Sequence, residues 1–139
     1  MAKLILFKKE SCPFCIKFKE SQNYNTLKEK LAADSETKDI SFYEYEKKED
    51  INGIENEIET AAKSKKIRGV PTLCLFNDGK KWDIIDIEVW ENKKENKRDI
   101  ENIFDNIKNT LKELKKADYK NKYIKYKVKY LELKNKYLQ

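Results

Sequence analysis

Cys12-Pro13-Phe14-Cys15 follows a short apolar run (residues 4–7) and precedes a stretch with helical periodicity. At a helix start, the first cysteine lies at the positive end of the helix dipole beside free backbone N–H groups, which favours its thiolate. Pro13 suits the first helical turn, where its missing N–H would have no partner anyway. The second cysteine lies one turn further on, where it can attack a mixed disulfide and release the partner. The motif therefore predicts Cys12 as the nucleophile and Cys15 as the resolving thiol.

Two other interpretations of the cysteines compete with this one. Half of a zinc site would need about four sulfur or nitrogen ligands, whereas this chain has three cysteines and no histidine. Two unreactive buried cysteines would leave the proline between them without a purpose. We expect no metal. The third cysteine, Cys74, lies in an apolar stretch and is expected to be a small core residue, with a regulatory or intermolecular disulfide as the alternative.

Length and composition predict one small domain with an appendage. The chain has 139 residues, of which 40% are charged, and its mean hydropathy of −0.92 predicts a small core. No apolar run approaches the roughly 18 residues that cross a membrane, so no membrane contact is expected. The first residues lack the plan of a signal peptide. We therefore expect a cytoplasmic, reducing compartment, where a CxxC pair is catalytic more often than structural.

The apolar periodicity predicts the element order β-α-β-α-β-β-α. Strands are expected over residues 3–8, 40–46, 73–76 and 82–90, and helices over 12–33, about 51–62 and 100–138. The first helix is expected to use Phe14, Phe18, Leu27 and Leu31 as apolar contacts, and residues 23–25 favour a break in it. A helix-length crossover predicts that the first two strands are parallel. The turn at residues 77–80, with Gly79 at positive φ, predicts an antiparallel hairpin of the last two.

A second motif, Ile67-Arg68-Gly69-Val70-Pro71-Thr72, stands at the start of the third predicted strand. Alone, its proline would be an ordinary proline at a strand start. Together with the CxxC motif and the element order, it makes the chain resemble the thioredoxin/glutaredoxin family over about residues 3–114. The resemblance implies a thioredoxin fold of the α/β class, with a central mixed four-stranded sheet. It also implies a cis Val70–Pro71 bond facing the CxxC motif, and substrate contacts from Gly69, Val70, Pro71 and Thr72, whose backbone would pair with a substrate chain.

Within that family the chain has the glutaredoxin plan, since no strand and helix precede the first predicted strand. Pro13-Phe14 is close to the glutaredoxin Pro-Tyr, and Lys9 matches the lysine that glutaredoxins use for the nucleophile and the glutathione carboxylate. The resemblance thus adds Lys9, Pro13 and Phe14 as substrate-binding residues. It implies a thiol–disulfide oxidoreductase that reduces protein or mixed disulfides.

Three positions depart from the family pattern and bear on the electron donor. Ser11 replaces the tryptophan that precedes the motif in thioredoxins, and Leu6 replaces their buried aspartate. Residues 90–97 stand where glutaredoxins have the Gly-Gly and Asp segment that holds glutathione. We expect no tightly bound cofactor and an external donor, with glutathione and a thioredoxin reductase both open.

The C-terminal part has a heptad pattern that runs from residue 100 to residue 138 without a break. One seam position holds Ile100, Ile107, Leu114, Asn121, Val128 and Asn135, and the other holds Ile103, Thr110, Ala117, Ile124, Leu131 and Leu138. Such a pattern is typical of a long helix that can coil with a partner, and buried asparagines set register in such pairs. A second stripe contains Tyr119, Tyr123, Tyr126, Tyr130, Leu133 and Tyr137.

This tail also carries the basic excess of the chain. Residues 110–139 contain ten lysines against three acids, which accounts for more than the whole net charge of +6. We predict a thioredoxin-like domain over 1–115 and a basic, tyrosine-rich helical extension over 116–139. The extension has three interpretations: a solvated helix, a helix that binds a second copy or a partner helix, or a polyanion-binding surface. No nucleic-acid motif supports the last, so nucleic acid is not the expected partner. The alternative to an enzyme is a redox-inert module, for instance in a larger particle, that works through this helix.

Overall fold

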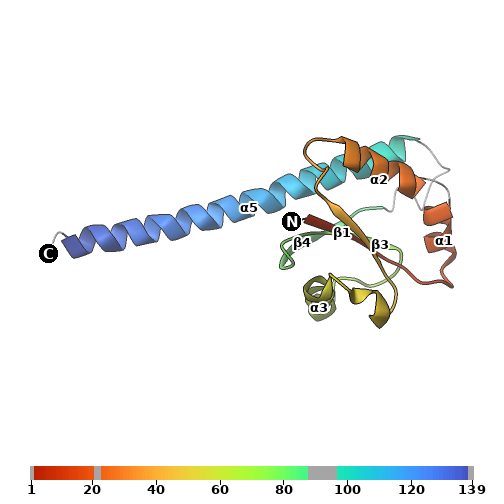
Figure 1. The fold of residues 1–139 in the computed structure, drawn as a ribbon, viewed down its shortest axis with the longest axis horizontal. Helices are drawn as coiled ribbons and strands as arrows, with labels where there is room; N and C mark the ends of the chain where they lie inside the picture. The colour runs from red at the N-terminus through yellow and green to blue at the C-terminus, as the bar shows by residue number, and fades with distance from the viewer. Residues whose placement is uncertain (1, 21–22, 88–96, 138–139) are drawn as a thin grey trace.

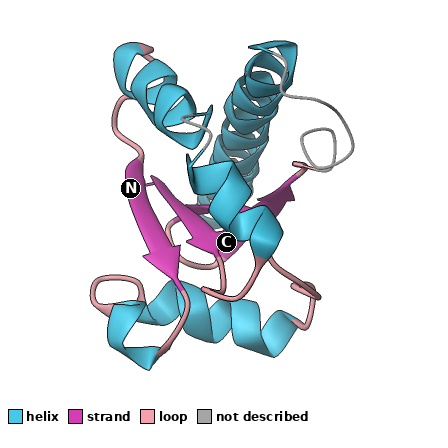
Figure 2. Ribbon diagram, turned by 90° about the vertical axis from the view of Figure 1, so that its right-hand side faces the viewer, coloured by secondary structure: helices cyan, strands magenta, loops and turns pink. Residues whose placement is uncertain are grey.

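The computed structural model describes residues 2–20, 23–87 and 97–137, which form a mixed sheet with helices on both faces (Figures 1 and 2). The strand order in the four-stranded sheet is β2-β1-β3-β4. The strands are β1 (Ala2–Phe7), β2 (Ser41–Tyr45), β3 (Thr72–Asn77) and β4 (Lys81–Ile85). The helices are α1 (Pro13–Glu20), α2 (Asn23–Ala33), the 3₁₀ turn η1 (Lys48–Ile51), α3 (Glu55–Ser64) and α5 (Lys97–Tyr137). This arrangement is a thioredoxin fold of the α/β class, as predicted.

The pairing of the strands also follows the prediction. β1 and β2 are parallel, with Leu6 opposite Glu44, and β3 is antiparallel to both β1 and β4. Asp78 and Gly79 in the hairpin turn have φ of 79° and 85°. Two successive residues at positive φ make a turn whose twist matches that of the flanking strands.

Two clusters of apolar side chains hold the layers together. The larger cluster lies between the sheet and α1, α2 and α5, and includes Leu4, Phe18 and Ile107, all completely buried. The smaller lies between the other face of the sheet and α3, and includes Ile5 and Phe76. Alternate residues of β1 therefore pack on opposite faces of the sheet, so β1 is a central strand covered on both faces.

Three predicted elements differ from the structure. The helix expected over about 51–62 begins at Glu55 as α3, and Ile51 ends η1 instead. The helix expected over 12–33 is divided into α1 and α2, and α2 begins at Asn23, at the start of the segment that the sequence marks as a break. Phe14, expected among the apolar contacts of this helix, is 53% exposed, whereas Phe18, Leu27 and Leu31 are buried as predicted.

The last strand is shorter than the predicted 82–90. β4 ends at Ile85, which pairs with Leu73, while residues 88–90 lie outside the described residues. The ladder would continue toward Pro71, which has no N–H to donate, so the pairing cannot extend past the start of β3. Asp86 and Ile87 are thereby left beyond the strand.

α5 is fixed to the body only along its first part. Ile100, Ile103, Ile107 and Leu111 are buried, and Leu114 packs at the edge of the core. An ion pair of 3.0 Å joins Lys108 Nζ to Asp34 Oδ2 after α2. Beyond this region the helix continues to Tyr137 and runs away from the body (Figure 1). No helix in the described part of the chain is long and apolar enough to span a membrane.

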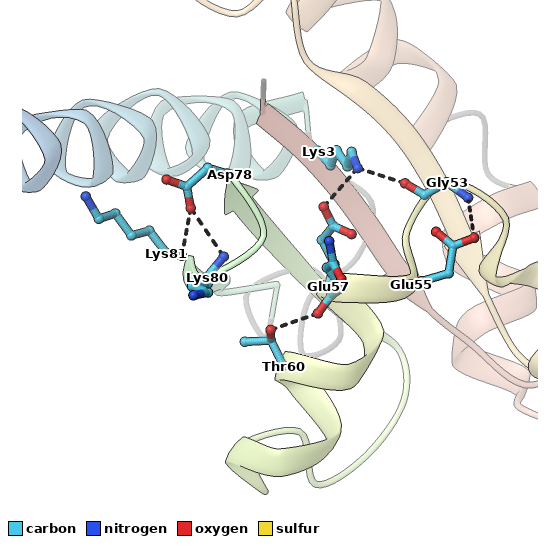
Figure 3. Close-up of polar contacts among 9 residues, drawn as sticks. Lys3, Gly53, Glu55, Glu57, Thr60, Asp78, Lys80 and Lys81 are labelled. Carbon is cyan, nitrogen blue, oxygen red and sulfur yellow. Dashed lines mark hydrogen bonds and ion pairs between the residues drawn. The ribbon is translucent and has the colours of Figure 1, made fainter.

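Polar contacts join β1 to α3 at the end of the sheet that lies opposite the CxxC motif (Figure 3). Lys3 Nζ, on β1, lies 2.9 Å from Glu57 Oε1 and donates to the Gly53 carbonyl oxygen at 2.7 Å. Glu57 is 5% exposed, so this ion pair fixes the first turn of α3 against the start of β1. These contacts position α3 and leave the other end of the sheet free for the cysteines.

Candidate functional site

Cys12 occupies the cap position of α1, directly before the first helical residue, Pro13. The Cys15 N–H donates to Cys12 Sγ at 3.2 Å, and the Ile16 N–H donates to the Cys12 carbonyl oxygen at 3.1 Å. A sulfur in this position accepts a backbone N–H that the helix itself leaves free. The same contact stabilises negative charge on the sulfur, because the N-terminus of the helix is its positive end.

The loop before β3 faces this sulfur. The thiol of Cys12 donates to the Val70 carbonyl oxygen over 3.7 Å, and the Val70–Pro71 peptide bond is cis, as predicted. Thr72 Oγ1 donates to the Gly69 carbonyl oxygen at 2.5 Å, which closes the loop on itself. The structure therefore brings together two motifs that are far apart in the sequence.

The two cysteines of the motif have different environments. Cys12 is half-buried and Cys15 is only 4% exposed, and both are free thiols. Burial, followed by the hydrogen bond with Cys12, raises the pKa of Cys15 to about 11. Cys15 thus stays protonated at neutral pH while its sulfur lies within one helical turn of Cys12. This asymmetry suits a pair in which one sulfur reacts with outside molecules and the other reacts only with its neighbour.

An open groove lies between the facing loop and the end of β4. It has a volume of about 470 Å³ and is lined by Gly69, Val70, Pro71, Thr72, Ile84, Ile85, Asp86 and Ile87. A Cβ added at Gly69 would meet no atom within 4 Å, so the loop is open on that side. On the other side of the cysteines, Phe14 and Ile16 are 53% and 43% exposed. Cys12 contacts Val70 of this groove and is close in the chain to the exposed Phe14 and Ile16, so a substrate chain at Cys12 can contact both.

The residues expected to bind substrate lie in three places. Pro13 and Phe14 lie on α1 beside Cys12, and Gly69, Val70, Pro71 and Thr72 lie along the groove. Lys9 is exposed, and its carbonyl oxygen accepts the Cys12 N–H at 3.1 Å, so its backbone helps to position the nucleophile.

Sequence reasoning missed the groove wall formed by residues 84–87. Ile84 is 37% exposed although it belongs to β4, while its neighbour Ile85 is buried. Two adjacent isoleucines on one strand must point to opposite faces. The sequence therefore contained an indication that one of the two was not a core residue.

The third cysteine belongs to the core. Cys74 is completely buried on β3, opposite Ile5 of β1 and Ile84 of β4. Its burial, together with the charge of Asp83, raises its pKa to about 12. This placement agrees with the expected core role. Among the described residues, no group of three or more Cys, Asp or Glu side chains is arranged to hold a metal ion.

We expect Cys74→Val to reduce the loss of stability at alkaline pH. The folded chain binds the Cys74 proton more tightly than the unfolded chain does, because its pKa lies above the ordinary value of 9.0. As pH rises from about 9 towards 12, this thiol lowers the free energy of unfolding by up to about 1.4 kcal/mol per pH unit. Valine is similar in size and does not titrate. Urea unfolding under reducing conditions at about pH 8 and about pH 10.5 measures the effect. Equal alkaline losses in the variant and the parent chain would contradict it.

Comparison with known proteins agrees with this geometry. A family model described as a thioredoxin-like domain matches residues 2–85. The matched segment begins in β1 and ends with β4, so it contains both cysteines of the motif and the facing Val70–Pro71 loop. Neither the search of curated proteins nor the search of solved structures gave a match. Because the matched residues are more than half of the chain, the chain belongs to the thioredoxin-like domain family.

Proposed function

We propose that this protein is a dithiol oxidoreductase that reduces disulfides in proteins or mixed disulfides with small thiols. One observation carries the proposal: Cys12 Sγ caps α1, accepts the Cys15 N–H at 3.2 Å and lies 3.7 Å from the Val70 carbonyl oxygen. The first contact places Cys12 Sγ at the N-terminus of α1, the positive end of the helix dipole. The second places the backbone just before β3 beside the sulfur, where an extended substrate can lie.

The reaction takes place in two exchange steps. The Cys12 thiolate attacks one sulfur of the substrate disulfide, forms a mixed disulfide and releases the other substrate sulfur as a thiolate, which takes a proton from water. Cys15 then loses its proton and attacks Cys12 Sγ. This step forms the Cys12–Cys15 disulfide and releases the second substrate thiol. The substrate has gained two electrons and the protein has lost two.

The raised pKa of Cys15 suits the order of these steps. A thiol with a pKa of about 11 does not compete with Cys12 for the first attack at neutral pH. Once the mixed disulfide has formed, Cys15 is the neighbouring sulfur and needs only to lose its proton to attack. The high effective concentration of a neighbouring group makes that second step fast.

Turnover requires an external two-electron donor in a reducing compartment. We propose glutathione or a thioredoxin reductase for this role. The glutaredoxin-like features are Pro13-Phe14 and Lys9, and the thioredoxin-like feature is the Val70–Pro71 loop. Measuring turnover with glutathione and its reductase, and separately with thioredoxin reductase, distinguishes the two donors.

The test of the proposed function is reduction of insulin disulfides by the full chain with each donor. The proposal predicts turnover that depends on protein concentration and on one of the donors. A chain that forms no Cys12–Cys15 disulfide when its dithiol is mixed with oxidised glutathione, and that does not speed insulin reduction, would support the other candidate. That candidate is a redox-inert module of the same fold, and the helix that runs beyond the body is the observation in its favour (Figure 1).

We expect Ile84→Asp to weaken substrate binding without stopping the chemistry. Ile84 lines the groove beside Val70 and is 37% exposed, so a polar side chain is tolerated there. An added charge removes apolar contact area and disfavours burial under a substrate. KM for a peptide disulfide should rise about fivefold to tenfold, with kcat within about twofold. Asp83→Asn, on the same strand outside the groove, is the control. A KM that is unchanged in Ile84→Asp would exclude this groove as a substrate contact.

A further inference from the structure

α5 extends well beyond the part that packs on the body. Among the described side chains of α5, the last in contact with the larger core cluster is Leu114, and the helix ends at Tyr137. At 1.5 Å per residue, the remaining part is roughly 35 Å long. Figure 1 shows this part running away from the sheet. Helices in proteins gain most of their stability from packing an apolar face on another element. We therefore expect a helix of this length to pack on another surface.

The sequence gives this part of α5 two distinct sides. The heptad side carries positions 117, 121, 124, 128, 131 and 135, and the tyrosine side carries positions 119, 123, 126, 130 and 137. One residue on each side has a described side chain: Leu131 is 48% exposed on the heptad side, and Tyr130 is 65% exposed on the other. The body of the protein therefore leaves the heptad side uncovered at Leu131.

The excess of lysine in this part of α5 disfavours pairing with a second copy. In a parallel pair, position 120 of one helix faces position 125 of the other and both are lysine, whereas Lys127 faces Glu132. In an antiparallel pair, the flanking positions 120, 127 and 134 face one another, and all three are lysine. Like charges at such positions destabilise the pair, and each copy would bring the same excess of lysine.

We propose that the heptad side of residues 117–135 binds an amphipathic helix of another protein in a parallel coiled coil. The partner helix would carry acidic residues opposite Lys120 and Lys125. Asn121 and Asn135 occupy seam positions where an asparagine on the partner would fix the register. A polyanion is the less suitable occupant, because a phosphate backbone would leave the apolar seam residues, such as Leu131, without a contact. The proposal does not depend on the redox activity of the cysteines.

The test uses the full chain and a fluorescent peptide with the sequence of residues 117–138, in which Lys120 and Lys125 are both replaced by glutamate. In a parallel pair with the chain, this peptide converts two Lys–Lys contacts into Lys–Glu contacts. It keeps the two Lys–Glu contacts between positions 127 and 132. Fluorescence anisotropy should show that it binds about tenfold more tightly than a peptide with the unchanged sequence. Equal binding of the two peptides would overturn the proposal.

Two neighbouring exposed residues provide matched variants of the chain. Leu131→Gln removes a seam side chain and should weaken binding of the glutamate peptide about tenfold or more, while Tyr130→Gln should change it less than about twofold. If Tyr130→Gln weakened binding more than Leu131→Gln, the interface would lie on the tyrosine side and the proposal would be refuted. Sedimentation of the chain alone as a dimer would refute it in favour of a second copy. Tighter binding of heparin than of the peptide, unchanged in Leu131→Gln, would refute it in favour of polyanions.

Discussion

Cys12→Ser is expected to lower the rate of insulin disulfide reduction about 1,000-fold or more, to the level of the donor alone. A serine hydroxyl does not ionise at neutral pH and cannot form a disulfide. Neither remaining thiol can take over, because burial raises the pKa of Cys15 to about 11 and that of Cys74 to about 12. Both are also buried and out of reach of a protein substrate. The measurement is the turnover of insulin with saturating donor.

Cys74→Val is the matched control for this loss. It removes a thiol from the core, on the other face of the sheet from Phe18 and the first helix, and should leave turnover within about twofold at neutral pH. A Cys12→Ser chain that keeps more than about a tenth of the turnover would show that another group carries out the first attack.

Phe18→Ala is expected to destabilise the fold by about 3–5 kcal/mol. Phe18 is completely buried on α1, and its ring lies 5.2 Å from that of Tyr24 on α2. Removing the ring leaves a cavity beneath the helix that carries both cysteines. Urea unfolding followed by circular dichroism gives the free energy of unfolding. Because this loss approaches the whole stability of a small domain, a partly unfolded chain is an expected outcome.

Ile16→Ala is the control on the same helix. Ile16 is 43% exposed, so its truncation should cost less than about 1 kcal/mol. Equal losses in the two variants would contradict the described packing of α1, in which Phe18 faces the core and Ile16 faces solvent.

The fold was predictable because its decisive residues act locally. Cys12 and Pro13 specify a helix start by cap and dipole chemistry, and the Asp78-Gly79 pair specifies a tight hairpin by its backbone freedom. The fully apolar run in residues 4–7 indicated a strand covered on both faces, and β1 is such a strand. The cis bond at Val70–Pro71 came from the family resemblance, since nothing local to that dipeptide distinguishes it from an ordinary trans bond.

The parts that were not predicted depend on contacts between distant residues. The end of β4 at Ile85 follows from its register against β3, where Pro71 stops the ladder. The groove beside Val70 exists because β4 ends there. A prediction that extends this strand to residue 90 therefore gives no indication of the groove. Phe14 lies in the first turn of α1, on the same side of the helix as the buried Phe18 one turn further on, and is nevertheless exposed. Periodicity reports which side of an element is apolar but not where its neighbours stop.

Mass spectrometry of a trapped intermediate tests most directly that Cys12 is the attacking sulfur. The Cys15→Ser chain is mixed with a peptide disulfide, quenched with acid and digested with trypsin. The account predicts that the substrate half is found in disulfide linkage on the Cys12 fragment, which runs from Glu10 to Lys17. Substrate attached instead to the Cys74 fragment, or no covalent adduct while the parent chain turns over the same disulfide, would contradict it.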